Sequence, residues 1–325
     1  MSNADVWHAG ERELQRRLGV AERMAEIGPR VLSPVLPQQH RAFYPLLNFV
    51  VVGAVSASGD LWAGMLEGAP GFAWSPDPSA LRLDTRLSGA DPCAQALLET
   101  GAVGLLGIDL TTRRRNRLSG QISAIDSNGL DIRVEQAFGN CPQFIQQRQL
   151  VAEACASEAA GTLVTNSLTD RMRELISAAD TCFVASGLPR DGQDTAVDVS
   201  HRGGWPGFVR VTADRLTMPE FCGNRFFNTL GNLLVNPRAG LLFVDFASGD
   251  LLQITGRVEL QWDAPQAERY EGVEHLWHLQ VECAVWRPGG SALRWQFEGF
   301  SPALRRTGRW ADESLSVNES GTPQE

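Results

Sequence analysis

The sequence predicts a mainly β protein made of two small antiparallel barrels, with a helical segment at its N-terminus. One observation is that short apolar runs alternate with turn signals, and each series holds one helix and closes on a long hairpin. The other is that a block recurs at an offset of 136 residues, from Gly71-Phe72 to Gly207-Phe208 and from Gly104-Leu105-Leu106 to Gly240-Leu241-Leu242. A fixed offset held over about fifty residues indicates an internal duplication.

The first segment, residues 1–45, is expected to be helical, with a helix over 5–27 that ends at Gly28-Pro29 because its apolar side chains recur at helical spacing. The first barrel is expected over 46–150. Its opening hairpin joins Phe49–Val55 to the run that begins at Leu61. A helix then begins at Asp91-Pro92, and a second hairpin closes the barrel.

The second barrel is expected over residues 165–305 and repeats this plan. A helix over 165–180 leads into it, a second helix is expected from Asn228 to Val235, and a hairpin from Ala239 to Leu260 follows. The tail, residues 306–325, is polar and is expected to be flexible.

Composition excludes several kinds of chemistry. The chain has 325 residues and 43% apolar content, which suits two domains. All 29 basic residues are arginine, so a pyridoxal phosphate Schiff base, a P-loop lysine and a lysine general base are excluded. A phosphate would have to be held by arginine, backbone N–H groups and hydroxyls. The net charge of −9 argues against a general nucleic-acid binder.

The expected location is the cytoplasm, and no membrane association is expected. The sequence has no apolar run of about eighteen residues. The first residues lack the basic and apolar regions of a signal peptide. The six cysteines are scattered without a CxxC pair, as in a reduced protein with buried thiols.

Several short motifs follow one another in the second copy, and together they resemble a known family. They are Phe208-Val209-Arg210-Val211, Leu216-Thr217-Met218-Pro219, Gly223-Asn224-Arg225, Asn232–Pro237 and Ile254-Thr255-Gly256-Arg257. In this order and spacing the chain resembles the pyridoxamine 5′-phosphate oxidase-like, FMN-binding split-barrel superfamily, closest to a two-copy (tandem) bacterial branch. The resemblance covers roughly residues 45–300. It implies two tandem split barrels with Greek-key antiparallel strands.

The resemblance also implies FMN as the cofactor, held mainly by the second barrel. It implies phosphate contacts at Asn224 and Arg225, and ring or ribityl contacts near Arg210 and Thr217. Physical chemistry agrees, because an arginine and small donors before a helix suit a phosphate. An arginine beside the ring would stabilise negative charge on reduction. The other candidate cofactor-binding residues are Val211, Met218, Asn228, His201, Arg202 and Trp295.

Each candidate also has a purely structural interpretation. Arg225 could pair with a carboxylate at the helix start, and Arg210 could form a cross-strand ion pair. The segment His201-Arg202-Gly203 could be a plain turn, and Trp295 could be a core residue. Many relatives place a basic residue after the arginine, where this chain has Phe226, which weakens the expected grip on a phosphate.

Two further clusters have simple interpretations. His275 and His278 lack a third ligand at a clear spacing, so no metal site is expected. Arg113-Arg114-Arg115 with Arg117 is expected to be a solvated turn, with an anionic partner or a nucleotide contact as the alternative. The first barrel is expected to lack a complete phosphate site, because acidic residues stand where donors would be needed: Asp84, Asp91 and Glu99.

The expected function is that of an FMN-dependent oxidoreductase or electron-transfer module. Its partner would be a small-molecule substrate or a redox partner protein. No catalytic nucleophile is recognisable, and flavin chemistry requires none. The alternatives are a degenerate barrel pair that has lost flavin and serves as a scaffold, and a haem-binding split barrel. The two barrels could form an internal pair, and a homodimer is also possible.

Overall fold

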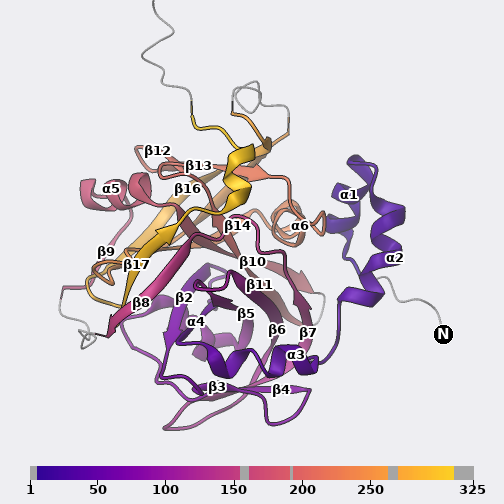
Figure 1. The fold of residues 1–325 in the computed structure, drawn as a ribbon, viewed down its shortest axis with the longest axis vertical. Helices are drawn as coiled ribbons and strands as arrows, with labels where there is room; N and C mark the ends of the chain where they lie inside the picture. The colour runs from indigo at the N-terminus through magenta and orange to yellow at the C-terminus, as the bar shows by residue number, and fades with distance from the viewer. Residues whose placement is uncertain (1–5, 154–160, 191–192, 263–269, 311–325) are drawn as a thin grey trace, which may run out of the picture.

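Two large antiparallel sheets and a two-stranded ribbon make up most of the fold, with helices on the outside (Figure 1). The computed structural model describes residues 6–153, 161–190, 193–262 and 270–310. The predicted fold class, mainly β with antiparallel sheets and flanking helices, is confirmed. Within the described part of the chain, no helix combines the length and apolar character needed to cross a bilayer.

The first sheet has seven strands in the order β2-β1-β5-β6-β7-β4-β3. Helix α4 (Pro92–Thr100) comes between β4 and β5 and packs against β1 and β2. Strand β7 was not expected from the sequence, where the closing hairpin was taken to be the last element. The strands are β1 (Phe49–Val55), β2 (Leu61–Glu67), β3 (Ala73–Trp74), β4 (Ala80–Leu83), β5 (Ala102–Asp109), β6 (Arg114–Ile125) and β7 (Leu130–Gly139).

The second sheet has eight strands, seven of them in the order β11-β10-β14-β15-β16-β13-β12, and β9 pairs with β16. Helix α5 (Asp170–Ala178) precedes the sheet, and α6 (Asn228–Val235) has the bounds expected from the sequence. The strands are β9 (Leu163–Thr165), β10 (Thr181–Arg190), β11 (Gln193–Gly203), β12 (Arg210–Thr212), β13 (Arg215–Phe221), β14 (Arg238–Val244), β15 (Leu251–Gln261) and β16 (Val273–Arg287).

The two strand orders are the same when the strands of each sheet are matched in chain order. Each sheet also has a bulge in its matched strand, directly before Gly120 in β6 and directly before Gly256 in β15. A Cβ at either glycine would lie 2.1 Å from a carbonyl oxygen of the next strand. The shared order and the shared bulge support an internal duplication, which stays a proposal.

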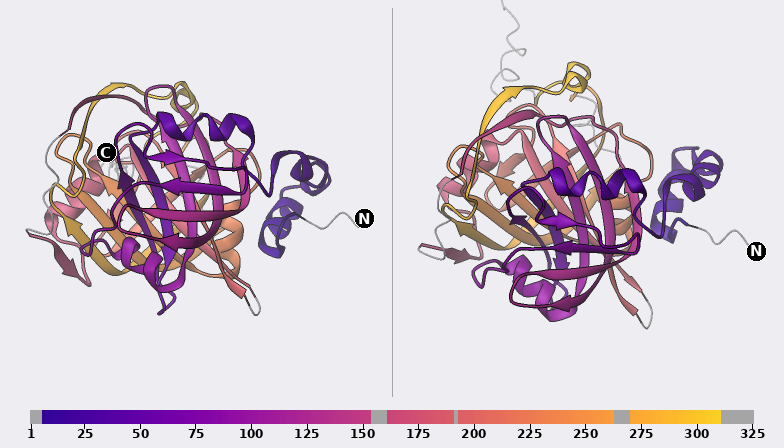
Figure 2. Two further views of the ribbon diagram at one scale, coloured as in Figure 1. Left: turned by 90° about the horizontal axis from the view of Figure 1, so that it is seen from below. Right: turned by 60° about the horizontal axis from the view of Figure 1, so that its bottom comes forward.

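The two sheets pack against each other and share a core (Figure 2). Two glycines allow close approach, one on each side of this contact. A Cβ on Gly104 in β5 would lie 2.7 Å from the carbonyl oxygen of Val197 in β11. A Cβ on Gly240 in β14 would lie 2.5 Å from the carbonyl oxygen of Leu61 in β2. One chain therefore contains two barrel-forming sheets in direct contact.

The N-terminal segment forms two helices, α1 (Ala9–Arg17) and α2 (Ala21–Val31), where the sequence predicted one that ends at Gly28-Pro29. The break falls at Gly19, which has a φ of +66°, and Pro29 lies inside α2. A proline near the last turn removes one backbone hydrogen bond without ending the helix. The expected first residue of the single helix, Asp5, lies outside the described residues.

The remaining elements connect and cover the sheets. Helix α3 (Gln38–Arg41) and the 3₁₀ turn η1 (Tyr44–Leu46) precede the first sheet. Strands β8 (Gln147–Glu153) and β17 (Leu293–Gly299) form the ribbon, followed by the 3₁₀ turn η2 (Pro302–Arg306). Most of the tail that was expected to be flexible lies outside the described residues.

Candidate functional site

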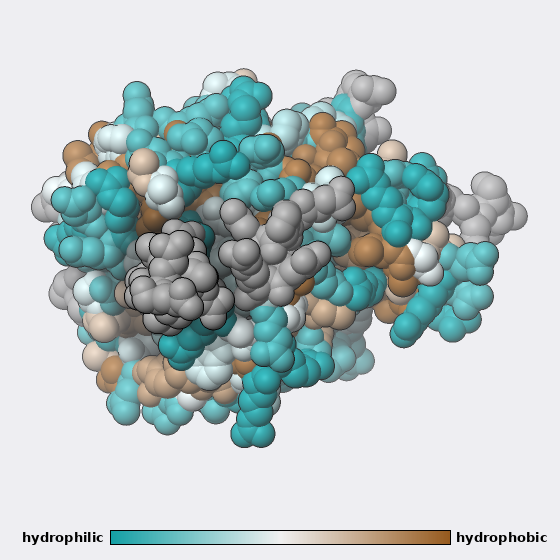
Figure 3. Space-filling model, turned by 90° about the horizontal axis from the view of Figure 1, so that it is seen from above, coloured by the Kyte–Doolittle hydropathy of each residue, from teal (hydrophilic) through white to brown (hydrophobic). Residues whose placement is uncertain are grey.

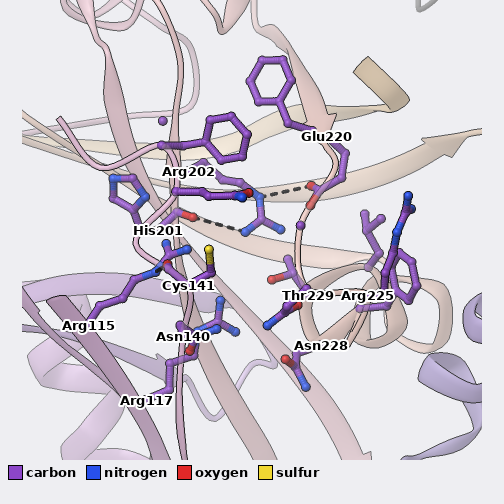
Figure 4. A pocket seen from close by; sticks show the side chains of 18 of the residues that line it. Arg115, Arg117, Asn140, Cys141, His201, Arg202, Glu220, Arg225, Asn228 and Thr229 are labelled. Atoms are coloured by element: carbon purple, nitrogen blue, oxygen red, sulfur yellow. Dashed lines mark hydrogen bonds and ion pairs between the residues drawn. The ribbon is translucent and has the colours of Figure 1, made fainter. Parts of the chain in front are cut away.

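A cavity of about 100 Å³ lies where the first sheet meets the second (Figure 4). Strand β6 of the first sheet and the segment that follows β7 form one side. The ends of β11 and β13 and the start of α6 form the other. Of the residues predicted as cofactor-binding, the cavity brings together His201, Arg202, Asn224, Arg225 and Asn228.

The structure places the other predicted residues away from this cavity. Arg210 stacks on Trp310, with its guanidinium carbon 4.7 Å from the ring centroid. Val211 lies on the same short strand, β12, which is the last strand in the sheet order. Thr217 lies near the start of β13 and shares a hydrogen bond of 2.9 Å with the Nδ1 atom of His278. The cavity is at the other end of β13, so these residues do not line it.

Two more predicted residues also lie elsewhere. Alternate side chains of a strand point to opposite faces of the sheet. Met218 is on the face opposite to Thr217 and is fully buried in the core of the second sheet. Trp295 lies on β17 and packs edge-on against Phe49, with ring centroids 5.7 Å apart. Five of the predicted cofactor-binding residues therefore do not line this cavity: Arg210, Val211, Thr217, Met218 and Trp295.

Arg225 is engaged by a carboxylate in this structure. Its Nη1 donates to Oε2 of Glu274 at 2.6 Å, and its Nη2 donates to Oε1 at 2.5 Å. This two-point geometry is the one that an arginine also uses to grip a phosphate. Arg225 therefore forms the ion pair with a carboxylate that its purely structural interpretation predicted. It also lines the cavity.

Arg202 connects β11 to β13 and to the start of α6. Its Nε donates to Oε2 of Glu220 at 3.1 Å, and its Nη1 donates to the hydroxyl of Ser200 at 2.8 Å. That hydroxyl is 2.7 Å from the hydroxyl of Thr229 in α6. The segment 201–203 belongs to a strand, so it is not the plain turn of its structural interpretation.

The first sheet contributes two arginines that the sequence did not place in the site. Arg115 donates from Nε to the carbonyl oxygen of Cys141 at 2.9 Å, and no acidic partner for it is found among the described residues. Arg117 pairs with Asp198 of β11 at 3.1 Å, and its buried Nε has no partner there. The arginine cluster at 113–117 was expected to be a solvated turn, and this is wrong for Arg115 and Arg117, which lie in strand β6 and line the cavity. Only the packing of the two sheets brings them to α6.

The cavity is electropositive. Burial, together with the nearby Arg117 and Arg202, lowers the pKa of Arg115 to about 9. An arginine stays protonated in proteins, and the described hydrogen bond of Arg115 is to a carbonyl oxygen, so no carboxylate among the described residues compensates its positive charge. Burial and the surrounding arginines also lower the pKa of His201 well below its ordinary value. His201 is therefore neutral, and neither ring nitrogen has a partner among the described residues.

Helix α6 begins at this cavity without a side-chain cap. The residue before it, Phe227, has a φ of +62°, and Arg225 has a φ of +65°. The first N–H groups of a helix have no partner within the helix, and they carry partial positive charge. An uncapped helix start beside several arginines is suited to an anion.

The matched helix of the first sheet is arranged differently. Asp91 caps α4 by accepting hydrogen bonds from the N–H groups of Cys93 and Ala94. The same carboxylate accepts from Nη1 of Arg287 at 2.8 Å and from Nε2 of Gln253 at 2.7 Å. A buried carboxylate thus already occupies the anion position of α4. This supports the expectation that the first barrel lacks a phosphate site.

His275 and His278 do not form a metal site in the described structure. Both lie on strand β16, and residues three apart on a strand point to opposite faces. His278 is hydrogen-bonded to Thr217 and Gln261, and His275 packs against the ring of Trp262. Within the described residues, no group of three or more histidine, cysteine, aspartate or glutamate side chains could hold a metal ion.

Comparison with known proteins finds a family match over the second sheet. Residues 168–298 match the family described as pyridoxamine 5′-phosphate oxidase. The predicted resemblance to pyridoxamine 5′-phosphate oxidase-like proteins is thereby confirmed for this segment. No curated protein sequence matches the chain.

Solved structures with partial similarity each correspond to little more than a third of the chain. HupZ from Group A Streptococcus is 18% identical, with 38% of this chain and 98% of that chain covered and a TM-score of 0.30. A putative pyridoxamine 5′-phosphate oxidase from Lactobacillus delbrueckii is 18% identical, with 37% and 94% covered and a TM-score of 0.29. A FAD-binding protein from Mesorhizobium loti is 14% identical, with 38% and 97% covered and a TM-score of 0.25.

Proposed function

We propose that the chain binds flavin mononucleotide at the cavity between its two sheets and acts as an oxidoreductase or electron-transfer module. The observation that carries this proposal is the uncapped start of α6, which faces arginines supplied by both sheets. Four arginines line the cavity. Three of them pair with the carboxylates of Glu220, Glu274 and Asp198, which leaves Arg115 without an acidic partner among the described residues. An anionic group placed there would relieve the excess of positive charge.

The residues present fit the phosphate of a flavin better than its ring. The cavity of about 100 Å³ is smaller than the roughly 300–1,000 Å³ of a typical small-molecule pocket. A phosphate inside could reach the N–H groups of α6, and Asn224 and Asn228 stand beside it as further polar groups. The rings of Phe144 and Phe221 stack at the same cavity, with centroids 5.2 Å apart. The flavin ring would therefore lie at the mouth of the cavity, outside the enclosed space.

The roles of the residues follow from their charges and partners. Arg115 would offer its free guanidinium N–H groups to the phosphate, since its described hydrogen bond is to a single carbonyl oxygen. Arg225 would also bind the phosphate, by releasing Glu274 and donating the same two N–H groups, from Nη1 and Nη2, to phosphate oxygens. His201 is neutral and adds no charge. When bound, flavin itself supplies the hydride or electron transfer, and the protein binds and orients it.

His201 is the residue that favours haem as a second candidate. A neutral imidazole is the form that binds iron, and His201 lines the cavity without a hydrogen-bond partner among the described residues. The ion pair between Arg225 and Glu274 favours the scaffold alternative instead, because the arginine is already satisfied without a ligand. The proposals for FMN as the cofactor and for a small-molecule or protein redox partner rest on the cavity and the family together.

The visible absorption spectrum of the purified full-length protein distinguishes these functions. Protein as isolated, and protein incubated with FMN and then desalted, should both be recorded. Retained flavin bands support the proposed function. A Soret band supports haem binding. A spectrum without either, before and after incubation, would reject the flavin proposal in favour of a scaffold.

A further inference from the structure

Helix α1 lies directly against α6, the helix that begins at the cavity. Two glycines permit this contact. A Cβ on Gly10 would lie 2.1 Å from the carbonyl oxygen of Gly231, and a Cβ on Gly231 would lie 2.8 Å from Cγ of Glu11. Packed helices ordinarily lie about 8–10 Å apart, at a distance set by the side chains at the crossing. The absence of a side chain at both positions brings the two backbones together.

Glu11 is buried in this contact and holds the first residue of α6. Only 5% of Glu11 is exposed. Its Oε1 accepts a hydrogen bond from Nδ2 of Asn228 at 2.6 Å, and its Oε2 accepts from the N–H of His8 at 2.9 Å. An ionised carboxylate can only accept, so Asn228 must turn its amide nitrogen toward Glu11. Asn228 also lines the cavity, whereas Glu11 does not.

Helix α1 holds the loop before α6 as well. Gln15 is 1% exposed, and its Nε2 donates to the carbonyl oxygen of Phe226 at 3.3 Å. The ring of Phe226 packs on Trp7, with centroids 5.2 Å apart, in a buried apolar cluster. Apolar surface is visible where the helical pair meets the rest of the molecule (Figure 3). Phe226 lies between Arg225 and Phe227, both with positive φ. Such a conformation is strained and persists only where its surroundings fix it.

We propose that α1 is a clamp that holds residues 224–228 in the shape that presents the start of α6 to an anionic ligand. Glu11 and Gln15 are its positioning residues. Helix α4 of the first sheet is fixed by its own cap, Asp91, whereas α6 has no side-chain cap and is held from α1. The identity of the ligand rests on the proposed function. The clamp is a property of the unliganded chain and can be tested without a ligand.

Hydrogen exchange of the unliganded full-length protein tests the clamp. Glu11→Ala should speed the exchange of backbone amides in residues 224–232 about tenfold or more. Opening of this segment in the wild type must break a buried hydrogen bond that the variant lacks, so the variant opens more easily. The matched control is Glu13→Ala on the same helix, where the carboxylate pairs with Arg16 and Arg17 at the surface. Gln15→Leu, of similar size, removes the other bond and should act in the same direction. Exchange as in the wild type in both Glu11→Ala and Gln15→Leu would overturn the clamp.

Titration with FMN tests whether the clamp serves the site. Glu11→Ala should weaken FMN binding about tenfold, Glu13→Ala should leave it unchanged, and riboflavin binding should respond less than FMN binding. Equal FMN affinity in Glu11→Ala and wild type would show that the clamp does not act on the ligand. If the wild type binds no FMN, the proposed function fails, and the exchange experiment alone decides the clamp.

Discussion

Arg225 and Glu274 form a two-point ion pair at the cavity, with nitrogen–oxygen distances of 2.6 and 2.5 Å. The fork of the guanidinium is thus occupied by a carboxylate in the unliganded protein. A phosphate at the start of α6 would have to displace this carboxylate. The glutamate is therefore a competitor of the proposed ligand, and this competition can be measured.

Glu274→Gln should tighten FMN binding several-fold, because a neutral amide competes less well for the guanidinium. Arg225→Ala should weaken FMN binding about ten- to a hundredfold, since a charge-assisted hydrogen bond contributes about 1.5–3 kcal/mol. Riboflavin, which has no phosphate, should respond to neither change. Calorimetric titration of both ligands measures these effects. Equal losses for FMN and riboflavin in Arg225→Ala would show that this arginine is structural. Glu259→Gln, which alters the exposed pair with Arg215, is the control.

Arg117 and Asp198 join the two sheets beside the cavity, and both side chains are largely buried. Arg117→Met should lower the free energy of unfolding by about 3 kcal/mol, because it leaves the carboxylate of Asp198 without its partner. Adding Asp198→Asn should recover part of this loss. Urea unfolding of the two single variants and the double variant measures the coupling. Additive losses would mean that the pair contributes nothing to the contact between the sheets.

Acid should loosen the N-terminal helices through His8. Burial, the largest cause, lowers its pKa from 6.5 to about 4. The unfolded chain therefore takes up a proton before the folded chain does. The contribution of neutral His8 to the free energy of unfolding is fully present above pH 6.5. It is lost as the pH falls toward 4, by at most about 3 kcal/mol. Urea unfolding between pH 7 and pH 4.5 should show this loss. His8→Asn keeps a helix-capping side chain but has no group that titrates in this range, so the loss of stability between pH 7 and pH 4.5 should be smaller in this variant. An unchanged pH dependence in His8→Asn would contradict the assignment.

Gly104→Ala and Gly240→Ala should destabilise the protein by similar amounts, about 1–3 kcal/mol each, because each Cβ would collide with the backbone of the opposite sheet. The control is Gly89→Ala, where the nearest atom to an added Cβ is 3.9 Å away. Thermal unfolding compares the three variants. A loss confined to one of the two glycines would argue against equivalent contacts on the two sides of the interface.

Much of the fold follows from local patterns. The apolar runs predict β1 and β2, and the start and end signals predict α6 with its observed bounds. The break of the N-terminal helix at Gly19 was missed because the apolar spacing continues on both sides of it. Strand β7 was missed although Leu130 to Glu135 alternate apolar and polar side chains, because the preceding hairpin was taken to be the last element of the barrel.

The candidate site could be predicted only in part. Asn224, Arg225 and Asn228 are adjacent in the sequence, so a motif before a helix is enough to find them. Arg115 comes from the other sheet, and its position at α6 depends on how the two sheets pack, which no local pattern records. The same holds for Glu11, which meets Asn228 from a helix more than two hundred residues earlier in the chain.

The central claim is that one flavin phosphate binds per chain, between arginines of both sheets. Calorimetric titration of FMN and riboflavin into the wild type and Arg115→Ala tests it most directly. The account predicts one FMN per chain, riboflavin at least about tenfold weaker, and loss of most of that difference in Arg115→Ala. Two equivalent FMN sites per chain, or equal affinity for FMN and riboflavin in the wild type, would contradict it.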